Sequence, residues 1–204
     1  MGSRMPDHWA LIMARGQSRR MGVPKGLVSL VEGGPPLLTL VDDLYRQLGW
    51  PRLVVTLDDL VAPYEAVLPR DGHRLWLGAE TGGETARTIQ LGYLFLAHRL
   101  QEEDFLWIHP VDLPLVQPET LVHLRNTLEE TAAEGIRPRF EERPGHPVVL
   151  QVALLRQLFG NLETPVVGTM KEQLQHLPLA LCPVDDAGVI MDFDDPRCIA
   201  AWQE

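Results

Sequence analysis

One short segment of the sequence combines residue types that suit chemistry on phosphates. Residues 14–25 read Ala-Arg-Gly-Gln-Ser-Arg-Arg-Met-Gly-Val-Pro-Lys and directly follow an apolar run. Glycine lets a phosphate approach backbone N–H groups, and the cationic side chains neutralise its charge. The spacing matches neither a Walker A loop nor a dinucleotide fingerprint. A solvated basic turn is the alternative, but the position of the segment after an apolar strand in an acidic chain favours phosphate binding.

A second segment offers a carboxylate at the end of another apolar run. Residues 105–115 read Phe-Leu-Trp-Ile-His-Pro-Val-Asp-Leu-Pro-Leu, and Asp112 lies between Pro110 and Pro114. The prolines stiffen the turn and limit where the carboxylate points. A carboxylate beside a triphosphate is unfavourable unless a divalent cation separates them, and Mg²⁺ binds one or two carboxylates plus substrate oxygens. We therefore expect Asp112 to be a metal ligand, with an ordinary aspartate of a proline-rich turn as the alternative, and His109 to be a structural or rim residue.

The C-terminal region supplies candidates for a second metal ligand. Residues 191–196 read Met-Asp-Phe-Asp-Asp-Pro. In a strand, Asp192 and Asp194 point to the same face because side chains alternate. Asp194, nearer the strand end, is the expected ligand and Asp192 is the second choice. Asp195 precedes a proline and is expected to cap the last helix.

The composition restricts the classes of function. The chain has 204 residues, a net charge of −10, 45% hydrophobic and 23% charged residues, which indicates a folded core. Such an acidic protein is not expected to bind nucleic acid, but a small nucleotide needs only a local cluster of cations or a metal. Two cysteines, Cys182 and Cys198, form no disulfide framework and suit a reducing, cytoplasmic location. No apolar run is long enough to span a membrane.

Strand and helix patterns alternate along the chain. Strands are expected at residues 8–14, 52–57, 74–77, 105–108, 136–140, 148–150, 179–184 and 189–193. Helices are expected at residues 36–48, 62–68, 84–100, 118–133, 152–159, 170–176 and 195–202. This alternation predicts one three-layer α/β/α domain at 8–204 with a mixed, mostly parallel sheet. Residues 1–7 are interpreted as an N-terminal extension, vector-derived in part. Ligands are expected beyond the carboxyl ends of the strands.

The phosphate segment resembles the signature of the MobA-like nucleotidyltransferases, A-G-G-x-S-x-R-M-G-x-x-K. The matching residues are Ala14, Gly16, Ser18, Arg20, Met21, Gly22 and Lys25. This family has a GT-A-like fold and includes the molybdenum cofactor guanylyl- and cytidylyltransferases. The resemblance implies that the loop wraps the triphosphate of an NTP, with Arg20 and Lys25 as catalytic cations. Arg15 replaces a glycine, and it either adds a phosphate contact, points outward or marks a degenerate site.

Other segments extend the resemblance over nearly the whole chain. Residues 111–114 are similar to the V-D-x-P motif, whose aspartate binds the metal, and residues 192–196 resemble D-I-D-T-P. Residues 82–88 resemble the base-recognition loop G-x-x-x-S-x-S, and residues 143–148 resemble G-R-R-G-H-P-V. By this resemblance, the further nucleotide-binding residues are Gly83, Thr85 and Thr88, and the acceptor-binding residues are Gly145 and His146. Helix capping by Thr85 and a purely structural role for His146 are the alternatives.

The resemblance implies a nucleotidyltransferase that depends on Mg²⁺ or Mn²⁺. It would transfer NMP from an NTP to a phosphorylated small molecule and release pyrophosphate, with Asp112 among its catalytic residues. The first candidate acceptor is a molybdopterin-type cofactor, with CTP or GTP as donor. A sugar phosphate or another phospho-alcohol is the alternative acceptor, and a catalytically degenerate NTP-binding maturation factor is the further alternative. Neither nucleic acid nor a membrane is an expected partner, and the oligomeric state stays open.

Overall fold

A computed structural model describes residues 4–16, 22–79, 85–160 and 170–203. The strands are β1 (His8–Met13), β2 (Arg52–Leu57), β3 (Arg74–Ala79), β4 (Phe105–Pro110), β5 (Gly135–Phe140), β6 (Arg143–Pro144), β7 (Val148–Gln151) and β8 (Ala180–Pro183). The α-helices are α1 (Leu37–Gln47), α2 (Val61–Val67), α3 (Thr85–Leu96), α4 (Pro118–Thr131), α5 (Val152–Phe159), α6 (Met170–Gln175) and α7 (Pro196–Gln203). Three short 3₁₀ helices are η1 (Lys25–Leu27), η2 (Asp58–Leu60) and η3 (Ala187–Ile190).

The strands form one sheet in the order β3-β2-β1-β4-β7-β5-β6, with β8 paired to β5. Parallel pairs join β1 to β2, β2 to β3, β1 to β4 and β5 to β8. Strand β7 is antiparallel to both β4 and β5. Strands β2 and β3 follow β1 on one side of the sheet, whereas β4 lies on its other side. The strand order therefore reverses between β1 and β4, and ligands of such sheets bind at that switch point. The prediction of a mixed, mostly parallel sheet is confirmed.

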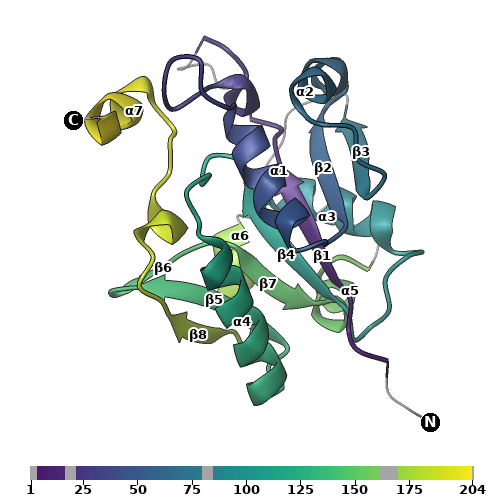
Figure 1. Cartoon of the computed structure of the whole chain (residues 1–204). Helices are drawn as coiled ribbons and strands as arrows, with labels where there is room; N and C mark the ends of the chain where they lie inside the picture. Colours follow the sequence, from purple (N-terminus) through teal and green to yellow (C-terminus); the bar gives the residue numbers. More distant parts are fainter. Residues whose placement is uncertain (1–3, 17–21, 80–84, 161–169, 204) are drawn as a thin grey trace.

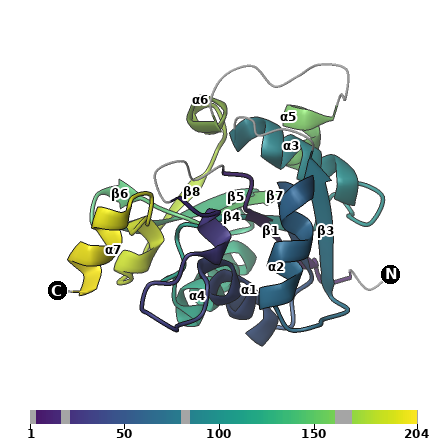
Figure 2. The same ribbon diagram turned by 90° about the horizontal axis from the view of Figure 1, so that it is seen from above.

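Helices cover both faces of the sheet, as Figures 1 and 2 show, with α1 and α4 on one side and α3, α5 and α6 on the other. Side-chain alternation in β1 explains this arrangement, because Ala10 and Ile12 enter one hydrophobic cluster and Leu11 enters the other. Helix α3 approaches β1 so closely that a Cβ atom on Gly92 would lie 2.4 Å from a methyl group of Leu11. The predicted three-layer architecture is confirmed.

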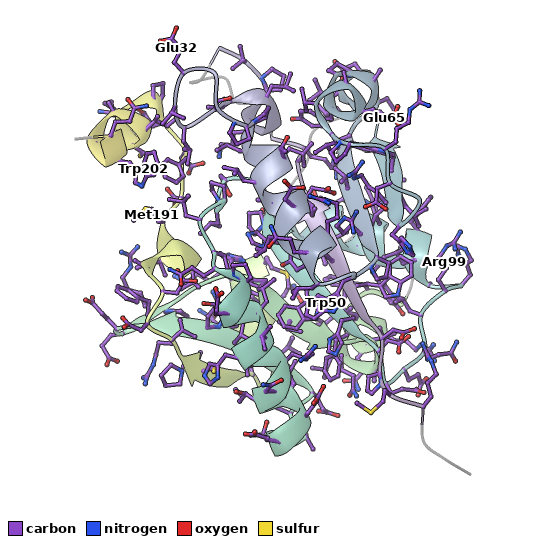
Figure 3. All side chains as sticks on the ribbon, viewed as in Figure 1. Glu32, Trp50, Glu65, Arg99, Met191 and Trp202 are labelled. Atoms are coloured by element: carbon purple, nitrogen blue, oxygen red, sulfur yellow. The ribbon has the colours of Figure 1, made fainter. Side chains whose placement is uncertain are left out.

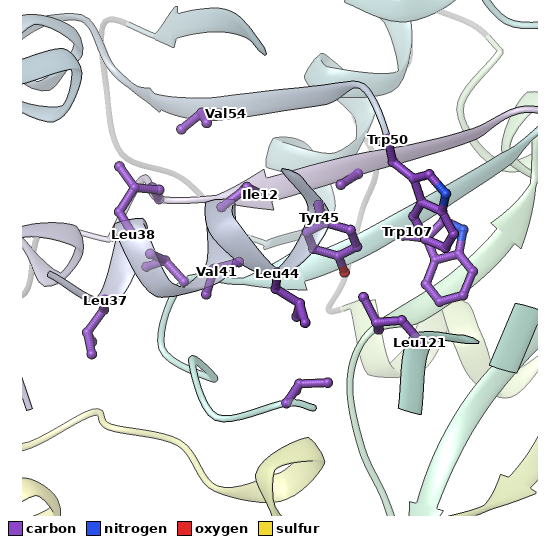
Figure 4. Close-up of a cluster of buried hydrophobic side chains, with 14 of the residues drawn as sticks. Ile12, Leu37, Leu38, Val41, Leu44, Tyr45, Trp50, Val54, Trp107 and Leu121 are labelled. Carbon is purple, nitrogen blue, oxygen red and sulfur yellow. The ribbon is translucent and has the colours of Figure 1, made fainter. Parts of the chain in front are cut away.

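The core on the α1 side is drawn in Figure 4. Leu38 and Val41 of α1 pack in one cluster with Ile12 and Val54 of the sheet, and all four are fully buried. Burying one such side chain contributes about 1.5–3 kcal/mol. The spacing of apolar residues along α1 is thus the cause of its position on the sheet.

Charged side chains such as Glu32, Glu65 and Arg99 project outward from this core (Figure 3). Among the described residues, no helix has the length and apolar character needed to cross a membrane.

Two expected elements differ in the structure. The strand expected at 189–193 is wrong, because η3 occupies Ala187–Ile190 and residues 191–194 have no regular secondary structure. The backbone N–H of Gly188 donates to the carboxylate of Asp186 at 2.9 Å, which forms a tight turn instead of an extended strand. The helix expected at 84–100 ends earlier, at Leu96.

A group of buried ion pairs stabilises the amino-terminal ends of β2 and β3. The Arg52 guanidinium donates to Asp42 at 3.0 Å and also pairs with Asp71. Arg74 donates to the same Asp42 carboxylate at 2.6 Å. We name these four residues the closed cluster, because each cation has a carboxylate partner within the protein. The cluster joins α1 to the two strands.

Candidate active site

A cavity of about 470 Å³ opens at the carboxyl ends of β1 and β4. Met13 and Pro110, the last residues of these paired strands, lie opposite each other in register and both line it. The other lining residues are Arg15, Gly16, Lys25, Thr85, Thr88, Val111, Asp112, Leu113, Arg143, Pro144, Gly145, His146, Val189, Ile190 and Asp192. The cavity therefore lies at the edge where ligands of parallel sheets bind.

Lys25 lies between two carboxylates at this cavity. Its Nζ atom donates to Asp112 Oδ2 at 2.7 Å and also to Asp194 Oδ1. Three segments far apart in the sequence thus meet at one cationic atom. The two aspartates preferred from the sequence lie together, whereas the second choice, Asp192, lines the cavity without contributing to these two ion pairs. We name Lys25, Asp112 and Asp194 the open cluster, because Lys25 and Asp112 line the cavity.

The C-terminal segment reaches Asp112 without forming a strand. The backbone N–H of Phe193 donates to the Asp112 carbonyl at 2.9 Å, and the Phe193 side chain is buried. Asp186 holds the preceding turn by accepting hydrogen bonds from the Gln117 backbone and the Thr120 hydroxyl. Asp195 accepts from the Arg197 backbone at 2.9 Å at the start of α7, which confirms its expected capping role.

The charged groups of the open cluster shift one another's pKa values. Burial raises the pKa of the Asp112 carboxyl, Lys25 opposes that shift, and the neighbouring Asp194 raises the pKa further. Burial alone would lower the pKa of the Lys25 ammonium, but its two carboxylate partners outweigh burial and raise it. Across the described ranges, no group of three or more His, Cys, Asp or Glu side chains is arranged to hold a metal. A metal held by these carboxylates would need further oxygen ligands from water or a substrate.

Arg15, which replaces the usual glycine, points inward. Its Nη1 atom donates to the Thr88 hydroxyl on α3 at 3.0 Å, and the residue is only 7% exposed. Burial and the nearby Arg87 lower the pKa of the Arg15 guanidinium. The outward orientation considered from the sequence is therefore wrong, and the Arg15 side chain adds a positive charge to the cavity wall. Thr88, expected to contact the nucleotide, holds this guanidinium in position.

The loop that contains Gly145 and His146 is held against η3. A Cβ atom on Gly145 would lie 2.4 Å from the Val189 carbonyl oxygen, so only glycine fits there. The backbone N–H of His146 donates to the same oxygen at 2.8 Å. Burial, the Arg137 charge and His109 lower the pKa of His146 to about 3. A hydrogen bond to the Ile108 backbone favours a higher pKa but does not offset these effects. His146 is thus neutral near pH 7 and lines the cavity without adding charge.

His109 has a structural position, as expected from the sequence. Its ring contacts the Tyr45 hydroxyl and the Leu113 carbonyl, each at 2.8 Å. Burial lowers its pKa to about 4. The neutral ring therefore fixes the turn that presents Asp112.

Some of the remaining residues expected to bind the nucleotide lie within the described part of the chain, and others do not. Gly16 and Thr85 line the cavity, and Ala14 is buried beside it with its backbone N–H bonded to Val55. Ser18, Arg20 and Gly83 lie outside the described residues. The sequence interpretation did not select Arg143, which lines the cavity. Its position at the start of the segment 143–148 was the signal that could have identified it.

Comparisons with known proteins show the family and the fold. Residues 10–176 match the family model for the MobA-like NTP transferase domain. The search of curated proteins found no match. Rv0371c from Mycobacterium tuberculosis H37Rv is 20% identical over 98% of both chains, with a TM-score of 0.74. It was also solved in complex with manganese, at 19% identity and a TM-score of 0.71, over 97% of this chain and 98% of that one.

Two enzymes of biosynthesis share the same fold. A 4-diphosphocytidyl-2C-methyl-D-erythritol synthase is 19% identical over 98% of both chains, with a TM-score of 0.70. Molybdopterin-guanine dinucleotide biosynthesis protein A from Archaeoglobus fulgidus is 18% identical over 95% of both chains, with a TM-score of 0.65. At these identities the likeness establishes the fold.

Proposed function

The chain belongs to the MobA-like NTP transferase family, and we propose that it transfers a nucleotidyl group from an NTP to a phosphorylated small molecule. The observation that carries this proposal is the open cluster, in which Asp112 and Asp194 converge on one cation at the edge of the cavity. Arg15 and Arg143 line the same cavity and add positive charge. This combination suits a triphosphate accompanied by a divalent cation.

The donor set fits Mg²⁺ or Mn²⁺. The Lys25 ammonium contacts both the Asp112 and the Asp194 carboxylates, so their oxygens lie close enough together to bind one ion. Asp112 and Asp194 would hold the metal, with Asp192 as the second choice for the C-terminal ligand. A bound divalent cation would supply neutralisation of the phosphate oxygens. The manganese complex of Rv0371c supports a metal at this fold.

The residues of the chain mainly position and neutralise the reactants. An oxygen of the acceptor phosphate attacks the α-phosphorus of the NTP, the bond from that phosphorus to the bridging oxygen breaks, and pyrophosphate leaves. The acceptor phosphate is already ionised, so no side chain needs to remove a proton. Lys25 and Arg15 would contact the triphosphate, joined by Arg20 from the adjoining segment. Such preorganised charges stabilise the transition state.

For the substrate, we propose first a molybdopterin-type acceptor with CTP or GTP. Molybdopterin-guanine dinucleotide biosynthesis protein A supports this choice, and the 4-diphosphocytidyl-2C-methyl-D-erythritol synthase supports a phospho-alcohol as the alternative. We also propose a cytoplasmic location, since both cysteines are free thiols.

A matrix of substrates tests the proposal. Each of the four NTPs is incubated with Mg²⁺ or Mn²⁺ and with molybdopterin or a panel of sugar and alcohol phosphates, and pyrophosphate release is measured. Release should require one NTP, one acceptor and the metal, and should disappear in Asp112→Asn. Tight NTP binding with no pyrophosphate from any pair would instead identify an NTP-binding maturation factor.

A further inference from the structure

A second cavity, of about 590 Å³, adjoins the first. Both cavities are lined by Met13, Thr85, Pro144 and His146, so they share a wall. The remaining lining residues are Ile89, Ile108, Arg137, Val148, Met170, Lys171 and Leu174. The second cavity lies on the face of the sheet that α3 and α6 cover, and its walls are mainly aliphatic.

Arg137 is the unusual residue of this cavity. Its Nε and Nη2 atoms both donate to the Gly145 carbonyl at 3.3 Å. Among the described residues, no carboxylate lies within ion-pair distance of this guanidinium, and burial lowers its pKa. Two residues further along the same strand, Arg139 pairs with Glu142 at 3.6 Å. A partly buried guanidinium with only a carbonyl partner is unfavourable unless an anion joins it.

The position of this charge suits the acceptor and not the nucleotide. Gly145, whose carbonyl holds the Arg137 guanidinium, itself lines the first cavity. Arg137 therefore lies at the junction between the two cavities, where an acceptor phosphate would meet the NTP. His146 also lies at this junction but is neutral, so it does not replace the cation.

We infer that the second cavity binds the acceptor, with its phosphate on Arg137 and an apolar or fused-ring body against the aliphatic walls. This inference rests on the proposed transferase function and narrows its substrate. A sugar with many hydroxyl groups needs a hydrogen-bond partner for each buried hydroxyl. Ile89, Ile108, Val148 and Leu174 offer no such partners from their side chains. The cavity therefore suits an acceptor with an apolar or fused-ring body better than it suits a simple sugar phosphate.

A fluorescent anion with an apolar body tests this site on the intact protein. The probe is 8-anilinonaphthalene-1-sulfonate, which carries aromatic rings and one anionic group. Wild-type protein should bind it with a fluorescence increase, and inorganic phosphate should weaken that binding. Arg137→Met should weaken probe binding at least tenfold and abolish the phosphate effect. The matched variant Arg139→Met should bind the probe like wild type.

Equal binding to Arg137→Met and Arg139→Met, or no probe binding to wild type, would overturn the inference. Thermal unfolding establishes that each variant is folded. If Arg137→Met does not fold, Arg137→Gln retains a donor for the Gly145 carbonyl and provides the same comparison. The outcome is independent of turnover. Arg137-dependent probe binding without pyrophosphate release would contradict the transferase proposal alone, whereas pyrophosphate release with Arg137-independent binding would contradict only this site.

Discussion

Two clusters of charged side chains lie at opposite ends of the strands in this sheet. The closed cluster holds two arginines and two aspartates at the amino-terminal ends of β2 and β3. The side chains of Arg52 and Asp42 are 1% and 0% exposed. Since every charge has a partner inside the protein, this cluster is complete without a ligand.

The open cluster at the carboxyl ends differs in composition and in access. It contains two carboxylates for one ammonium, and the side chains of Lys25, Asp112 and Asp194 are 15%, 20% and 53% exposed. Burial raises the pKa of Asp112, Lys25 opposes that rise, and Asp194 adds to it. Burial of charge alone therefore does not indicate function, because the closed cluster is buried and yet lines neither cavity, whereas Lys25 and Asp112 line the first one.

The largest expected effect is on catalysis at the open cluster. Asp112→Asn removes a proposed metal ligand, and we expect kcat to fall about 1,000-fold, the scale of losing a preorganised electrostatic group. The free energy of unfolding should change by about 1 kcal/mol or less, because Lys25 keeps Asp194 as a partner. Pyrophosphate release and urea unfolding measure the two quantities. A variant that retains more than a tenth of wild-type kcat would contradict the role of Asp112.

The reciprocal change breaks the closed cluster. Asp42→Asn leaves Arg52 and Arg74 without their shared carboxylate, and the free energy of unfolding should fall by about 3 kcal/mol or more. Transferase activity per folded molecule should stay unchanged, since none of these residues lines either cavity. If activity falls further than the folded fraction does, the separation between the two clusters is wrong.

A substitution of Lys25 separates its proposed contact with the triphosphate from its position between the two carboxylates. In Lys25→Met the triphosphate loses a charge-assisted hydrogen bond of about 1.5–3 kcal/mol, so KM for the NTP should rise at least tenfold. Mn²⁺ without nucleotide should bind more tightly, because the ammonium no longer occupies the position between Asp112 and Asp194. Electron paramagnetic resonance of Mn²⁺ measures this affinity. The other lysine of the chain, Lys171, is the control, and Lys171→Met should leave Mn²⁺ affinity unaltered.

The last expected effect is the pH dependence of stability that His109 contributes. Its pKa is about 4 in the folded protein, against 6.5 for an ordinary histidine. Between these values the unfolded chain binds a proton that the folded chain does not, so stability falls as pH decreases from 6.5 to 4. The slope is about 1.4 kcal/mol per pH unit for one histidine. Urea unfolding of His109→Gln should show a smaller slope than wild type, and identical slopes would refute this assignment.

Much of the fold and part of the candidate site followed from local sequence patterns. The apolar run before residue 14 and the proline-flanked Asp112 are contiguous signals, and both lie at the cavity. The proximity of Asp112 and Asp194 was also expected, but the reason given for it was wrong, because the segment that contains Asp194 does not form a strand. Residues 191–194 are irregular, and a hydrogen bond from Phe193 brings the segment to Asp112. Local spacing cannot predict a backbone contact between segments that are remote in the sequence.

The sequence by itself determined the alternation of strands and helices and the placement of charged residues directly after apolar runs. The pattern of apolar residues and the order of residues along the chain are local signals, which each short segment carries independently. Only the tertiary structure decided that Arg15 points inward to Thr88 and that Arg137 has no carboxylate partner among the described residues. The environment of a buried charge depends on which elements pack around it. Arg137 and Arg139 look alike in sequence, yet only Arg137 lines the second cavity.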